Sequence, residues 1–430
     1  MRFVEDHGAT RLENQFAAAT IPDTMPEVIY LDHNATAPIA PEVREAMLPY
    51  LTDDWGNPSS SYRFGTKLKG VIETAREQVA ELLGASPREI IFTSCATESN
   101  NTALHAALKA NPAKRHLVTS AVEHSSVLSY CQAAAREGVR VTCLPVDREG
   151  LLQFADLENA LTADTALVSL MWANNETGVL FPVQEIAELC RSRGVLFHCD
   201  AVQAAGKVPV DLRTLPVDYL AVTGHKFGAP KGIGALYVRR KAPFSPLIHG
   251  GHQERGRRGG TESVPLIVGL GRAAELARKH LPDYDAKVRP LRDALEQGLL
   301  APACRSRGEE ALAEKTGDQS LLTSAPTSAV PGTELNGHPT QRLANTANLT
   351  FHGIESEALL LLLDQEGVCA SSGSACLADS DEPSHVVKAM KPDTGASRQM
   401  IRFSLGLENS RKDIETALDA VRSAVKALHG

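Results

Sequence analysis

The sequence predicts an α/β fold whose main part is a mostly parallel sheet of seven strands, joined to a smaller α+β domain. Between residues 89 and 239, short runs rich in β-branched residues alternate with segments of helical periodicity, and this alternation is typical of parallel sheets. After Gly250 the alternation stops, which indicates a second domain. The predicted strands are Ile90–Ser94, His116–Ala121, Val139–Val146, Ala166–Ala173, Val195–Val202, Tyr219–Thr223 and Gly234–Val238.

Helices are predicted where apolar residues recur at helical spacing. One such helix ends at Gly84, because a glycine directly after the last periodic residue is typical of a helix C-terminus. A long helix is predicted from Ser263 to about Leu300. The last helix is predicted to begin at Ser410, where Asp413 completes a capping box three residues later. The apolar positions of the first of these helices are Leu68, Ile72, Ala75, Val79 and Leu82.

These elements suggest two domains. We place the large domain at residues 40–280 and the small domain at residues 1–39 together with 281–430. The segment 303–331 is rich in Ser, Thr, Ala, Pro and charged residues without a clear period, so it is predicted to be a surface insertion.

Composition narrows the classes of partner. The formal net charge is −8, from 52 acidic and 44 basic residues without a block of like charge, which argues against nucleic acid and anionic membranes as main partners. The longest apolar run, Ala358–Leu363, is far shorter than a membrane span. The first 20 residues lack an apolar core of signal-peptide length, so a cytoplasmic location is expected. The eight cysteines include no CxxC pair, and no metal site is expected.

Lys226 follows the predicted strand Tyr219–Thr223 in a polar, glycine-rich turn. Ligands of open α/β sheets bind at the carboxyl ends of the strands, so this amine is expected to reach such a ligand. A lysine amine forms a Schiff base with an aldehyde when its surroundings lower its pKa. A single loop lysine is nevertheless more often solvated, and a surface position is the alternative.

Asp200 lies near the end of the otherwise apolar strand predicted at 195–202. A carboxylate in this place needs a partner. A pyridinium nitrogen is a suitable one, because an aspartate keeps that nitrogen protonated and the ring an electron sink. The alternative, which is the commoner role for a single aspartate, is that Asp200 caps the following helix.

Polar residues follow other strands as well. Ala96 and Thr97 begin a helix after the first predicted strand, and the free N–H groups of a helix N-terminus suit a phosphate. Thr223 and His225, at a neighbouring strand end, are candidates for further donors.

His124 follows the second predicted strand, where it is a candidate to lie against a cofactor ring and to move protons. A capping or core histidine is the alternative. Asn175 lies in a polar turn after the fourth strand. Because such turns follow several strands of one sheet, the sequence predicts a single site that they share.

The order of these motifs resembles the cysteine desulfurases, which belong to the class V aminotransferase group of the fold-type I pyridoxal-phosphate enzymes. The resemblance extends from about Tyr30 to Val425. Within the family, the chain is most similar in its motifs to the subgroup that serves iron–sulfur assembly and nitrogen fixation. It rests on Tyr30-Leu31-Asp32-His33-Asn34-Ala35-Thr36, Gly56-Asn57-Pro58-Ser59-Ser60, Thr97-Glu98-Ser99, Glu123-His124, Asn174-Asn175-Glu176, Asp200-Ala201-Val202-Gln203, Gly224-His225-Lys226 and Ser371-Ser372-Gly373-Ser374-Ala375-Cys376.

The resemblance implies pyridoxal 5'-phosphate as cofactor and a role for each motif. Lys226 is implied to be the Schiff-base lysine, Asp200 the partner of the ring nitrogen, and His124 the residue that stacks on the ring. Gln203 and Asn175 are implied to bind the phenolic oxygen of the cofactor. The implied phosphate ligands are Ala96, Thr97, Thr223 and His225.

Other implied roles concern the substrate and a second subunit. Thr261 is similar to the residue that family members lend to the phosphate site of the neighbouring subunit, which implies a homodimer with shared sites. Arg402 is similar to the arginine that binds the carboxylate of the L-cysteine substrate, and its planar fork suits a carboxylate better than a lysine would. Asn34 and Asn175 are expected to assist it.

Cys376 determines the reaction that the resemblance implies. The thiolate is the reactive form of cysteine, and Cys376 lies in a loop rich in Ser, Gly and Ala. It is implied to take sulfur from L-cysteine as a persulfide, leaving L-alanine, and to pass the sulfur to an acceptor protein such as an iron–sulfur scaffold. For a single cysteine, inert burial is the alternative.

Other readings remain open at this point. A selenocysteine lyase or another class V aminotransferase would need the cofactor but not necessarily Cys376. A non-catalytic sulfur-relay or scaffold-binding subunit would keep the fold for docking without the cofactor, and the joint presence of Lys226, Asp200 and Arg402 disfavours it. The chain also departs from the family pattern, with Cys95 in place of a usual glycine and Tyr62 in place of a usual histidine.

Overall fold

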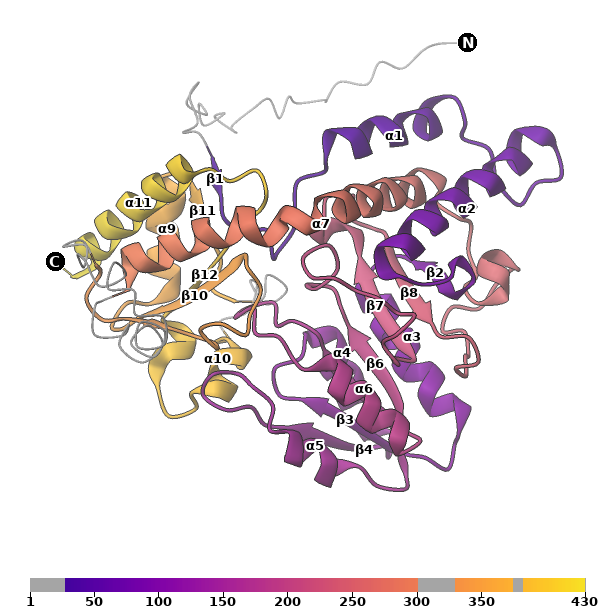
Figure 1. Ribbon diagram of the computed structural model, residues 1–430, viewed down its shortest axis with the longest axis horizontal. Coiled ribbons are helices and arrows are strands. Elements are labelled where there is room, and N and C mark those ends of the chain that lie inside the picture. The colour runs from indigo at the N-terminus through magenta and orange to yellow at the C-terminus, as the bar shows by residue number, and fades with distance from the viewer. Residues whose placement is uncertain (1–27, 301–328, 374–381, 430) are drawn as a thin grey trace, which may run out of the picture.

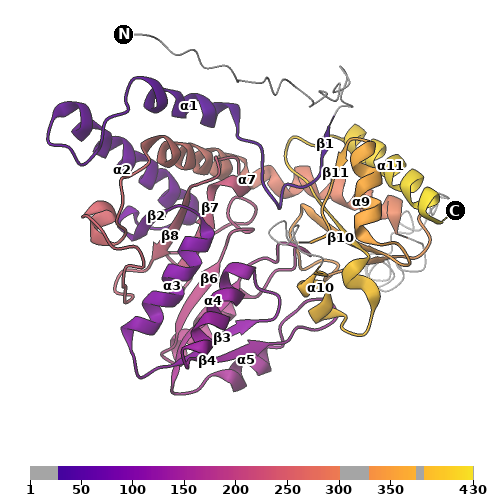
Figure 2. The same cartoon turned by 180° about the vertical axis from the view of Figure 1, so that it is seen from behind.

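The computed structural model describes residues 28–300, 329–373 and 382–429. Its helices and strands form two groups that lie side by side in Figures 1 and 2, a larger one around a seven-stranded sheet and a smaller one around short sheets. The first strand, β1, lies in the smaller group, beside helices from the C-terminal end of the chain. Most of the insertion predicted at 303–331 falls outside the described residues.

The large sheet has the strand order β2-β8-β7-β6-β5-β3-β4. All neighbours are parallel except β8, which runs antiparallel to both β2 and β7. This confirms the prediction of a mostly parallel sheet, and every predicted strand is present. The strands are β2 (Ile90–Thr93), β3 (His116–Ser120), β4 (Arg140–Leu144), β5 (Thr165–Met171), β6 (Leu196–Asp200), β7 (Tyr219–Thr223) and β8 (Gly234–Val238).

Helices cover both faces of this sheet. In β2 the alternation of side chains shows the division, because Ile90 and Phe92 pack in one hydrophobic core and Ile91 packs in another. The first core includes residues of α2, α6 and α7, and the second includes residues of α3 and α4. The helices are α1 (Pro41–Thr52), α2 (Arg63–Leu83), α3 (Ala96–Ala110), α4 (Ser125–Arg136), α5 (Phe154–Ala160), α6 (Val183–Ser192) and α7 (Val264–Leu299).

The smaller group contains a three-stranded antiparallel sheet of order β12-β10-β9 and a parallel pair, β1 and β11. Its elements are β1 (Ile29–Tyr30), β9 (Thr333–Leu335), β10 (Thr346–Phe351), α9 (Ser356–Gln365), β11 (Val368–Cys369), α10 (His385–Met390), β12 (Met400–Ser404) and α11 (Arg411–His429). Short 3-10 helices occur at Pro87–Glu89, Gly224–Lys226, Gln253–Gly256 and Gly395–Arg398.

Helix α7 joins the two groups. Its first half contributes residues such as Ile267 and Leu270 to the core of the large sheet. Its second half contributes Val288 and Leu295 to the core of the smaller group. The boundary predicted at residue 280 falls between these two halves, inside the helix.

Two of the predicted helix ends show the local reasons for the fold. Gly84 ends α2 in a left-handed conformation with φ of 61°, which a glycine adopts without steric cost. At the start of α11, the backbone N–H of Ser410 donates to Asp413 Oδ2, and the backbone N–H of Asp413 donates to Ser410 Oγ. The predicted capping box is therefore present.

The carboxyl ends of the parallel strands meet the smaller group. Arg342, in the loop before β10, pairs with Val179 in the loop after β5. Asn348 on β10 donates to the backbone oxygen of Glu176 in the same loop. This edge of the sheet is therefore covered by residues from both groups, and a pocket formed there can draw side chains from each.

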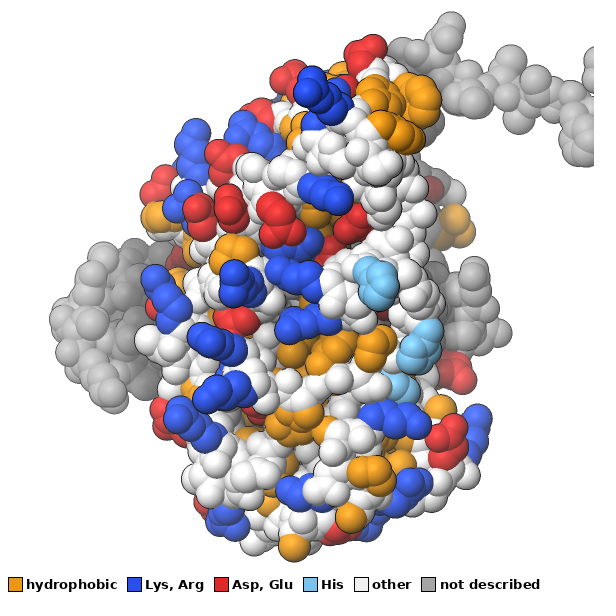
Figure 3. Space-filling view, turned by 90° about the vertical axis from the view of Figure 1, so that its right-hand side faces the viewer, with side chains coloured by type: hydrophobic (Ala, Val, Ile, Leu, Met, Phe, Trp, Pro, Cys, Tyr) orange, Lys and Arg blue, Asp and Glu red, His pale blue; other side chains and the backbone are white. Residues whose placement is uncertain are grey.

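The surface does not carry its charge evenly. Although the chain is acidic overall, the face turned to the viewer in Figure 3 shows lysine and arginine side chains across its centre, with apolar side chains exposed between them. In the part of the chain that the structure describes, none of the helices has the length and apolar character that crossing a membrane requires.

The packing of α7 on α2 generates a stability prediction. A Cβ added at Gly271 would lie 2.7 Å from both the Cα and the Cβ of Ala75, so Gly271→Ala forces the two helices apart. We expect this variant to lose about 1–3 kcal/mol of stability, seen as a lower Tm. Gly70 is the control, since it is an exposed residue of α2 with no atom near its would-be Cβ.

Gly70→Ala is expected to gain about 0.5–1 kcal/mol, because alanine is the better helix former. The same chemical change thus has opposite signs at two helical positions. A Tm for Gly271→Ala equal to or above that of the unaltered protein would contradict the tight contact between α2 and α7.

Candidate active site

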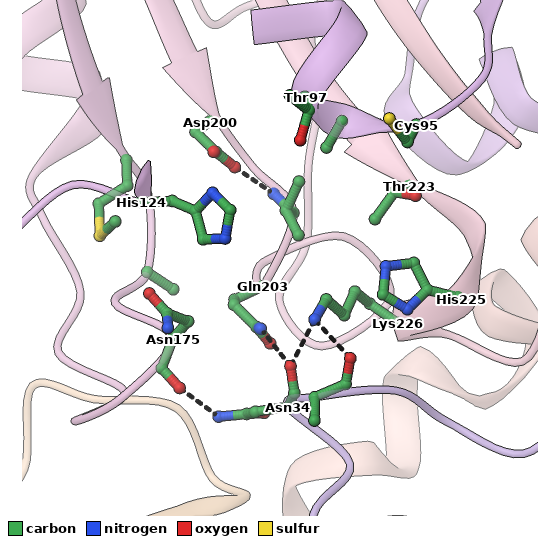
Figure 4. A pocket seen from close by; sticks show the side chains of 15 residues that line it. Asn34, Cys95, Thr97, His124, Asn175, Asp200, Gln203, Thr223, His225 and Lys226 are labelled. Carbon is green, nitrogen blue, oxygen red and sulfur yellow. Dashed lines mark hydrogen bonds between the residues drawn. The ribbon is translucent and has the colours of Figure 1, made fainter. Parts of the chain in front are cut away.

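A pocket opens at the carboxyl edge of the large sheet (Figure 4). It brings together nearly all the residues that the sequence assigned to the cofactor, and it adds Asn34 from the segment after β1. Its lining residues are Asn34, Ala35, Cys95, Ala96, Thr97, His124, Met171, Ala173, Asn175, Asp200, Val202, Gln203, Thr223, His225 and Lys226. The strand ends predicted to share one site therefore do so.

Lys226 is held inside this pocket. It lies in the 3-10 turn after β7, and its Nζ donates to the backbone oxygens of Asn34 at 2.6 Å and Ala35 at 2.8 Å. Figure 4 shows both bonds, with the amine directed toward the middle of the pocket. The alternative of a solvated surface lysine is therefore wrong.

Asp200 does not cap a helix, because a turn follows β6, and its pairing with a ring nitrogen stays a prediction. The residue ends β6 and is only 5% exposed. Its Oδ1 accepts from the backbone N–H of Val202 at 3.0 Å, which closes a turn, and its Oδ2 accepts from Asn100 Nδ2 at 2.7 Å. The carboxylate is thus fixed at the wall of the pocket by two donors.

The imidazole of His124 has a defined orientation. His124 is the N-cap of α4, and its Nδ1 lies 3.1 Å from the backbone nitrogen of Ser126 and 2.9 Å from Ser126 Oγ. A backbone N–H can only donate, so Nδ1 accepts and the proton of the neutral ring is on Nε2. Burial lowers the pKa of His124, which favours this neutral form.

A short chain of hydrogen bonds joins His124 to Asp200. Ser126 Oγ contacts His124 Nδ1 and accepts from Asn100 Nδ2 at 2.9 Å, and the same Nδ2 group donates to Asp200. The acidic partner determines the orientation of the Asn100 amide, because its oxygen would be repelled by the carboxylate. Asn100 and Ser126 therefore align two groups of the pocket without lining it.

The N-terminus of α3 forms one end of the pocket. The helix begins at Ala96 with Cys95 as its N-cap, and no side chain caps it. Free N–H groups of the first turn, together with Thr97, therefore face the cavity and suit an anion. Across from them, Thr223 donates its hydroxyl to the backbone oxygen of Ile233 at 3.1 Å, so it must rotate in order to donate to a phosphate.

His225 is part of the same end of the pocket. Its Nδ1 lies 3.3 Å from Thr36 Oγ1. Burial, reinforced by the positive charge of Lys226, lowers the pKa of His225 to about 4. The ring is therefore neutral near pH 7 and serves an anion through an N–H bond rather than through a full charge.

Two amides and one guanidinium group line or border the end of the pocket opposite the start of α3. Asn34 Nδ2 donates to the backbone oxygen of Asn175 at 3.1 Å, and Gln203 Nε2 donates to the backbone oxygen of Asn34 at 2.9 Å. Arg402 does not line the pocket, but its Nη1 donates to the same oxygen of Asn175 at 3.1 Å. Its Nη2 donates to Asp32 Oδ1 at 2.6 Å.

One N–H group of Arg402 is left without a hydrogen-bond acceptor in the described part of the chain. The residue is 1% exposed, and its Nε is buried with no hydrogen-bond partner among the described residues. An unsatisfied buried donor is costly, so a site next to it favours an acceptor such as a carboxylate. This observation agrees with an anionic group binding beside Asn175.

Besides Arg402, one predicted site residue of the described part of the chain lies outside the pocket. Thr261 is exposed and lines a second hollow with Glu254 and Arg258. Cys376 lies outside the described residues, and its position relative to the pocket stays a prediction.

The ends of the segment that contains Cys376 are nevertheless defined. Before it, the backbone of Ser371 pairs with the backbone of Arg402, and a Cβ added at Gly373 would lie 3.5 Å from Glu176 Oε2. After it, Ser384 Oγ donates to the same Glu176 Oε2 at 2.5 Å. Both ends therefore lie at Glu176, the residue directly after Asn175 of the pocket.

Several residues that shape the site gave no chemical signal in the sequence. Met171 and Ala173, at the end of β5, and Val202 form apolar wall. An apolar residue at a strand end is equally typical of the core, so only their position after a strand could have indicated them. Asn100 acts from the second turn of α3, where an asparagine has no expected role.

Glu123, next to His124, is a buried acid with an unusual protonation state. It is fully buried, its Oε1 accepts from Ser120 Oγ at 2.8 Å and from the backbone N–H of Met171 at 3.0 Å, and its Oε2 has no partner among the described residues. Burial raises the pKa of Glu123 from 4.5 to about 8. The side chain is therefore mostly a neutral acid at pH 7.

This state has a measurable consequence. The folded protein binds the Glu123 proton more tightly than the unfolded chain, so the resulting stabilisation is complete below about pH 4.5 and is lost as the pH rises toward about 8. Glu123→Gln removes the titrating group but keeps a neutral side chain. We expect the variant to gain Tm relative to the unaltered protein between about pH 5 and about pH 8. A constant difference in Tm over this range would show that Glu123 is ionised in the fold.

Comparisons with known proteins show the family of this chain. The family model of class V aminotransferases matches residues 29–316 and 308–417. The chain is similar to cysteine desulfurase 2 of Trichormus variabilis, with 50% identity over 93% of this chain and 94% of that protein. It is also similar to cysteine desulfurase NifS of Azotobacter vinelandii, with 46% identity over 93% of each chain.

The structural comparison agrees. A solved structure described as a NifS-like protein superposes with a TM-score of 0.81 and 34% identity, covering 93% of this chain and all of that one. These similarities confirm the resemblance seen in the motifs and the fold type that it implied. The chain belongs to the cysteine desulfurases, within the class V aminotransferase family.

Proposed function

We propose that this protein is a pyridoxal-phosphate-dependent cysteine desulfurase that takes sulfur from L-cysteine, releases L-alanine and keeps the sulfur as a persulfide on Cys376. The observation that carries the proposal is the meeting of Lys226 and Asp200 in one pocket, beside the residue where both ends of the Cys376 segment lie. An amine, a carboxylate and an approaching thiol are the groups that this reaction requires.

The donor set of the pocket suits pyridoxal 5'-phosphate. Lys226 would bond to its aldehyde carbon, Asp200 would accept from its ring nitrogen, and His124 would lie on its ring face. Gln203 and Asn175 would contact its phenolic oxygen. Its phosphate would take the anion site at the start of α3, formed by Ala96, Thr97, Thr223 and His225. When bound, this cofactor supplies an electron sink for negative charge at the α-carbon of an amino acid.

Substrate recognition falls to the opposite end of the pocket. Arg402, with its buried and unsatisfied Nε, would bind the carboxylate of L-cysteine. Asn34 and Asn175 border the same place and would add contacts. The amine of Lys226 would then take the proton from the substrate's α-carbon, because it is the basic group held at the middle of the pocket.

Sulfur transfer is assigned to Cys376. Its thiolate would attack the sulfur of the substrate, so that an S–S bond forms and the C–S bond breaks. The electron pair of the broken bond stays with the substrate's β-carbon, which takes up a proton and becomes the methyl group of alanine. The persulfide then passes to a sulfur acceptor, for which an iron–sulfur scaffold or another thiol carrier is the proposed class.

A homodimer with shared sites is part of the proposal. Thr261 is exposed, outside its own pocket, in a segment that also carries Arg255 and Arg258. An exposed hydroxyl beside arginines suits the phosphate of a neighbouring subunit's cofactor. Apolar side chains exposed on the face in Figure 3 support an interface, because apolar side chains form the buried centre of such contacts.

The direct test compares the unaltered protein with Cys376→Ser. With bound cofactor and L-cysteine, the unaltered protein should release alanine, whereas the variant should bind the cofactor, keep its visible absorbance and release no alanine, because serine cannot accept sulfur. Cys143→Ser, at an exposed cysteine on β4, is the matched control and should keep full activity.

Each result separates the candidate functions. Full alanine release by Cys376→Ser would reject the persulfide role. Release of a keto acid in place of alanine would indicate an aminotransferase, and a strong preference for L-selenocysteine that does not need Cys376 would indicate a selenocysteine lyase.

A second variant tests the carboxylate site. Arg402→Lys keeps the positive charge but loses the planar fork, so we expect the KM for L-cysteine to rise roughly 10-fold or more. The visible spectrum of the bound cofactor should not change, since Arg402 does not line the pocket wall. An unchanged KM would place the substrate carboxylate elsewhere.

A further inference from the structure

Lys207 is a buried lysine that the proposed reaction does not use. It lies in the turn after β6 and is 8% exposed. Its Nζ donates to Gln203 Oε1 at 2.7 Å and to Asn34 Oδ1 at 3.0 Å. Both acceptors are neutral amide oxygens, and both residues line the candidate active site.

The amine determines how the Gln203 amide is oriented. A lysine Nζ offers N–H bonds to these amides, so the oxygen of Gln203 must face it and the NH₂ group must face the other way. That NH₂ group then donates to the backbone oxygen of Asn34 at 2.9 Å. With the amide reversed, two donors would face one another at Lys207.

The same reasoning applies to the side chain of Asn34. Its Oδ1 accepts from Lys207 and also from Asn345 Nδ2 at 3.0 Å. Its NH₂ group is therefore directed to the backbone oxygen of Asn175 at 3.1 Å and to Thr346 Oγ1 at 2.9 Å. A single amine thus orients two amides on neighbouring parts of the pocket.

The Gln203 amide donates to the carbonyl that holds Lys226, and the Asn34 amide anchors the residue to which that carbonyl belongs. The backbone oxygen of Asn34 accepts from Gln203 Nε2 at 2.9 Å and from Lys226 Nζ at 2.6 Å. If the amides could turn, this carbonyl would lose one of its donors and the segment at Asn34 would lose its side-chain anchors. The position of the Lys226 amine therefore depends on Lys207, although Lys207 is not in the pocket lining.

The electrostatic surroundings fit this role. Burial, together with the positive charges of Lys226 and Arg402, holds the pKa of Lys207 well below its usual range. Its two side-chain partners, Gln203 Oε1 and Asn34 Oδ1, are neutral amide oxygens, so its contacts order these amides without a carboxylate between them.

We propose that Lys207 is a positioning residue for the reaction proposed above, which orders the amides of Gln203 and Asn34 and through them the carbonyl that holds the Lys226 amine. The inference rests on the proposed function, because it assigns Lys226 and Gln203 to the cofactor. Lys207 itself touches neither substrate nor cofactor in this proposal.

The test compares Lys207→Met with Lys391→Met. Lys391 is a matched control, since it is also 8% exposed and its Nζ also donates to two side chains, Glu334 Oε1 and Asn336 Oδ1, each at 2.7 Å. It lies in the smaller group, outside the pocket lining. Both variants lose a buried amine, so both are expected to lower Tm.

The readouts are the Kd of pyridoxal 5'-phosphate for the cofactor-free protein, measured by titration, and the kcat for alanine formation. We expect Lys207→Met to weaken cofactor binding and to lower kcat, each roughly 10-fold or more. The reason is that the free energy of one lost buried hydrogen bond and one freed amide corresponds to roughly a tenfold change or more in a binding constant. Lys391→Met should leave both values within about twofold. Equal behaviour of the two variants would overturn the inference.

A double-mutant cycle shows whether Lys207 acts through Gln203. If it does, Gln203→Ala together with Lys207→Met should bind the cofactor no more weakly than the worse single variant, whereas additive losses would overturn the inference. Should Lys207→Met fail to fold, Lys207→Gln, which keeps an N–H donor, enters the same cycle with the same criteria. Failure of the proposed function is distinct, because the unaltered protein would then bind no cofactor or form no alanine.

Discussion

The parallel pairing of β3, β5, β6 and β7 is the constraint on which the site depends. Parallel strands end at a common edge, and each of these strands is followed by a polar turn that supplies one wall of the pocket. The antiparallel β8 lets β2 end at this edge too, since two reversals restore its direction. The α3 helix that follows β2 then brings its N-terminus to the same place. The geometry of the sheet backbone thus brings polar side chains from distant parts of the chain to one edge.

The second requirement is a contact between the two groups of elements. The segment after β1 starts in the smaller group and crosses to the large sheet, where the backbone oxygens of Asn34 and Ala35 hold Lys226. Arg402 reaches in from β12 and meets the turn of Asn175. The lysine and the arginine are thus each held by a residue of the other group. A rearrangement of one group against the other would therefore change the proposed cofactor site and the proposed substrate site together.

Much of this arrangement could be predicted because its signals are local. Strand positions followed from apolar runs and their polar ends. Asp200 stood out as a charge near the end of an apolar strand, and Lys226 through its glycine-rich turn directly after a strand. The predicted positions of the strand ends were less accurate, for physical reasons. The apolar run through Val202 continues past the end of β6, because Asp200 accepts from the backbone N–H of Val202 and turns the chain. The exposed edge strand β4 is shorter than its run of β-branched residues, since it has a partner on one side only.

Residues that act through another side chain could not be predicted. Asn100, Ser126 and Lys207 lie in a helix, at a helix start and in a turn, where amides, hydroxyls and lysines are ordinary. Their roles come from which atom faces which, and this depends on the folded positions of residues far apart in the chain, such as Asn100 and Asp200. A pattern of residue types contains no such information. The family resemblance supplied roles only for residues that touch the cofactor or the substrate.

The charge of the site follows one physical rule. Burial keeps Glu123, His124, His225 and Lys207 toward their neutral forms, so that these groups serve as hydrogen-bond donors and acceptors without adding net charge. Arg402 pairs with Asp32, and Asp200 is held in place by two N–H donors. In a medium of low polarity, a charge without a partner is expensive, so the site retains charge where an anionic or cationic group of a ligand would meet it. The neutral network around these few ions is what allows them to remain buried and oriented at once.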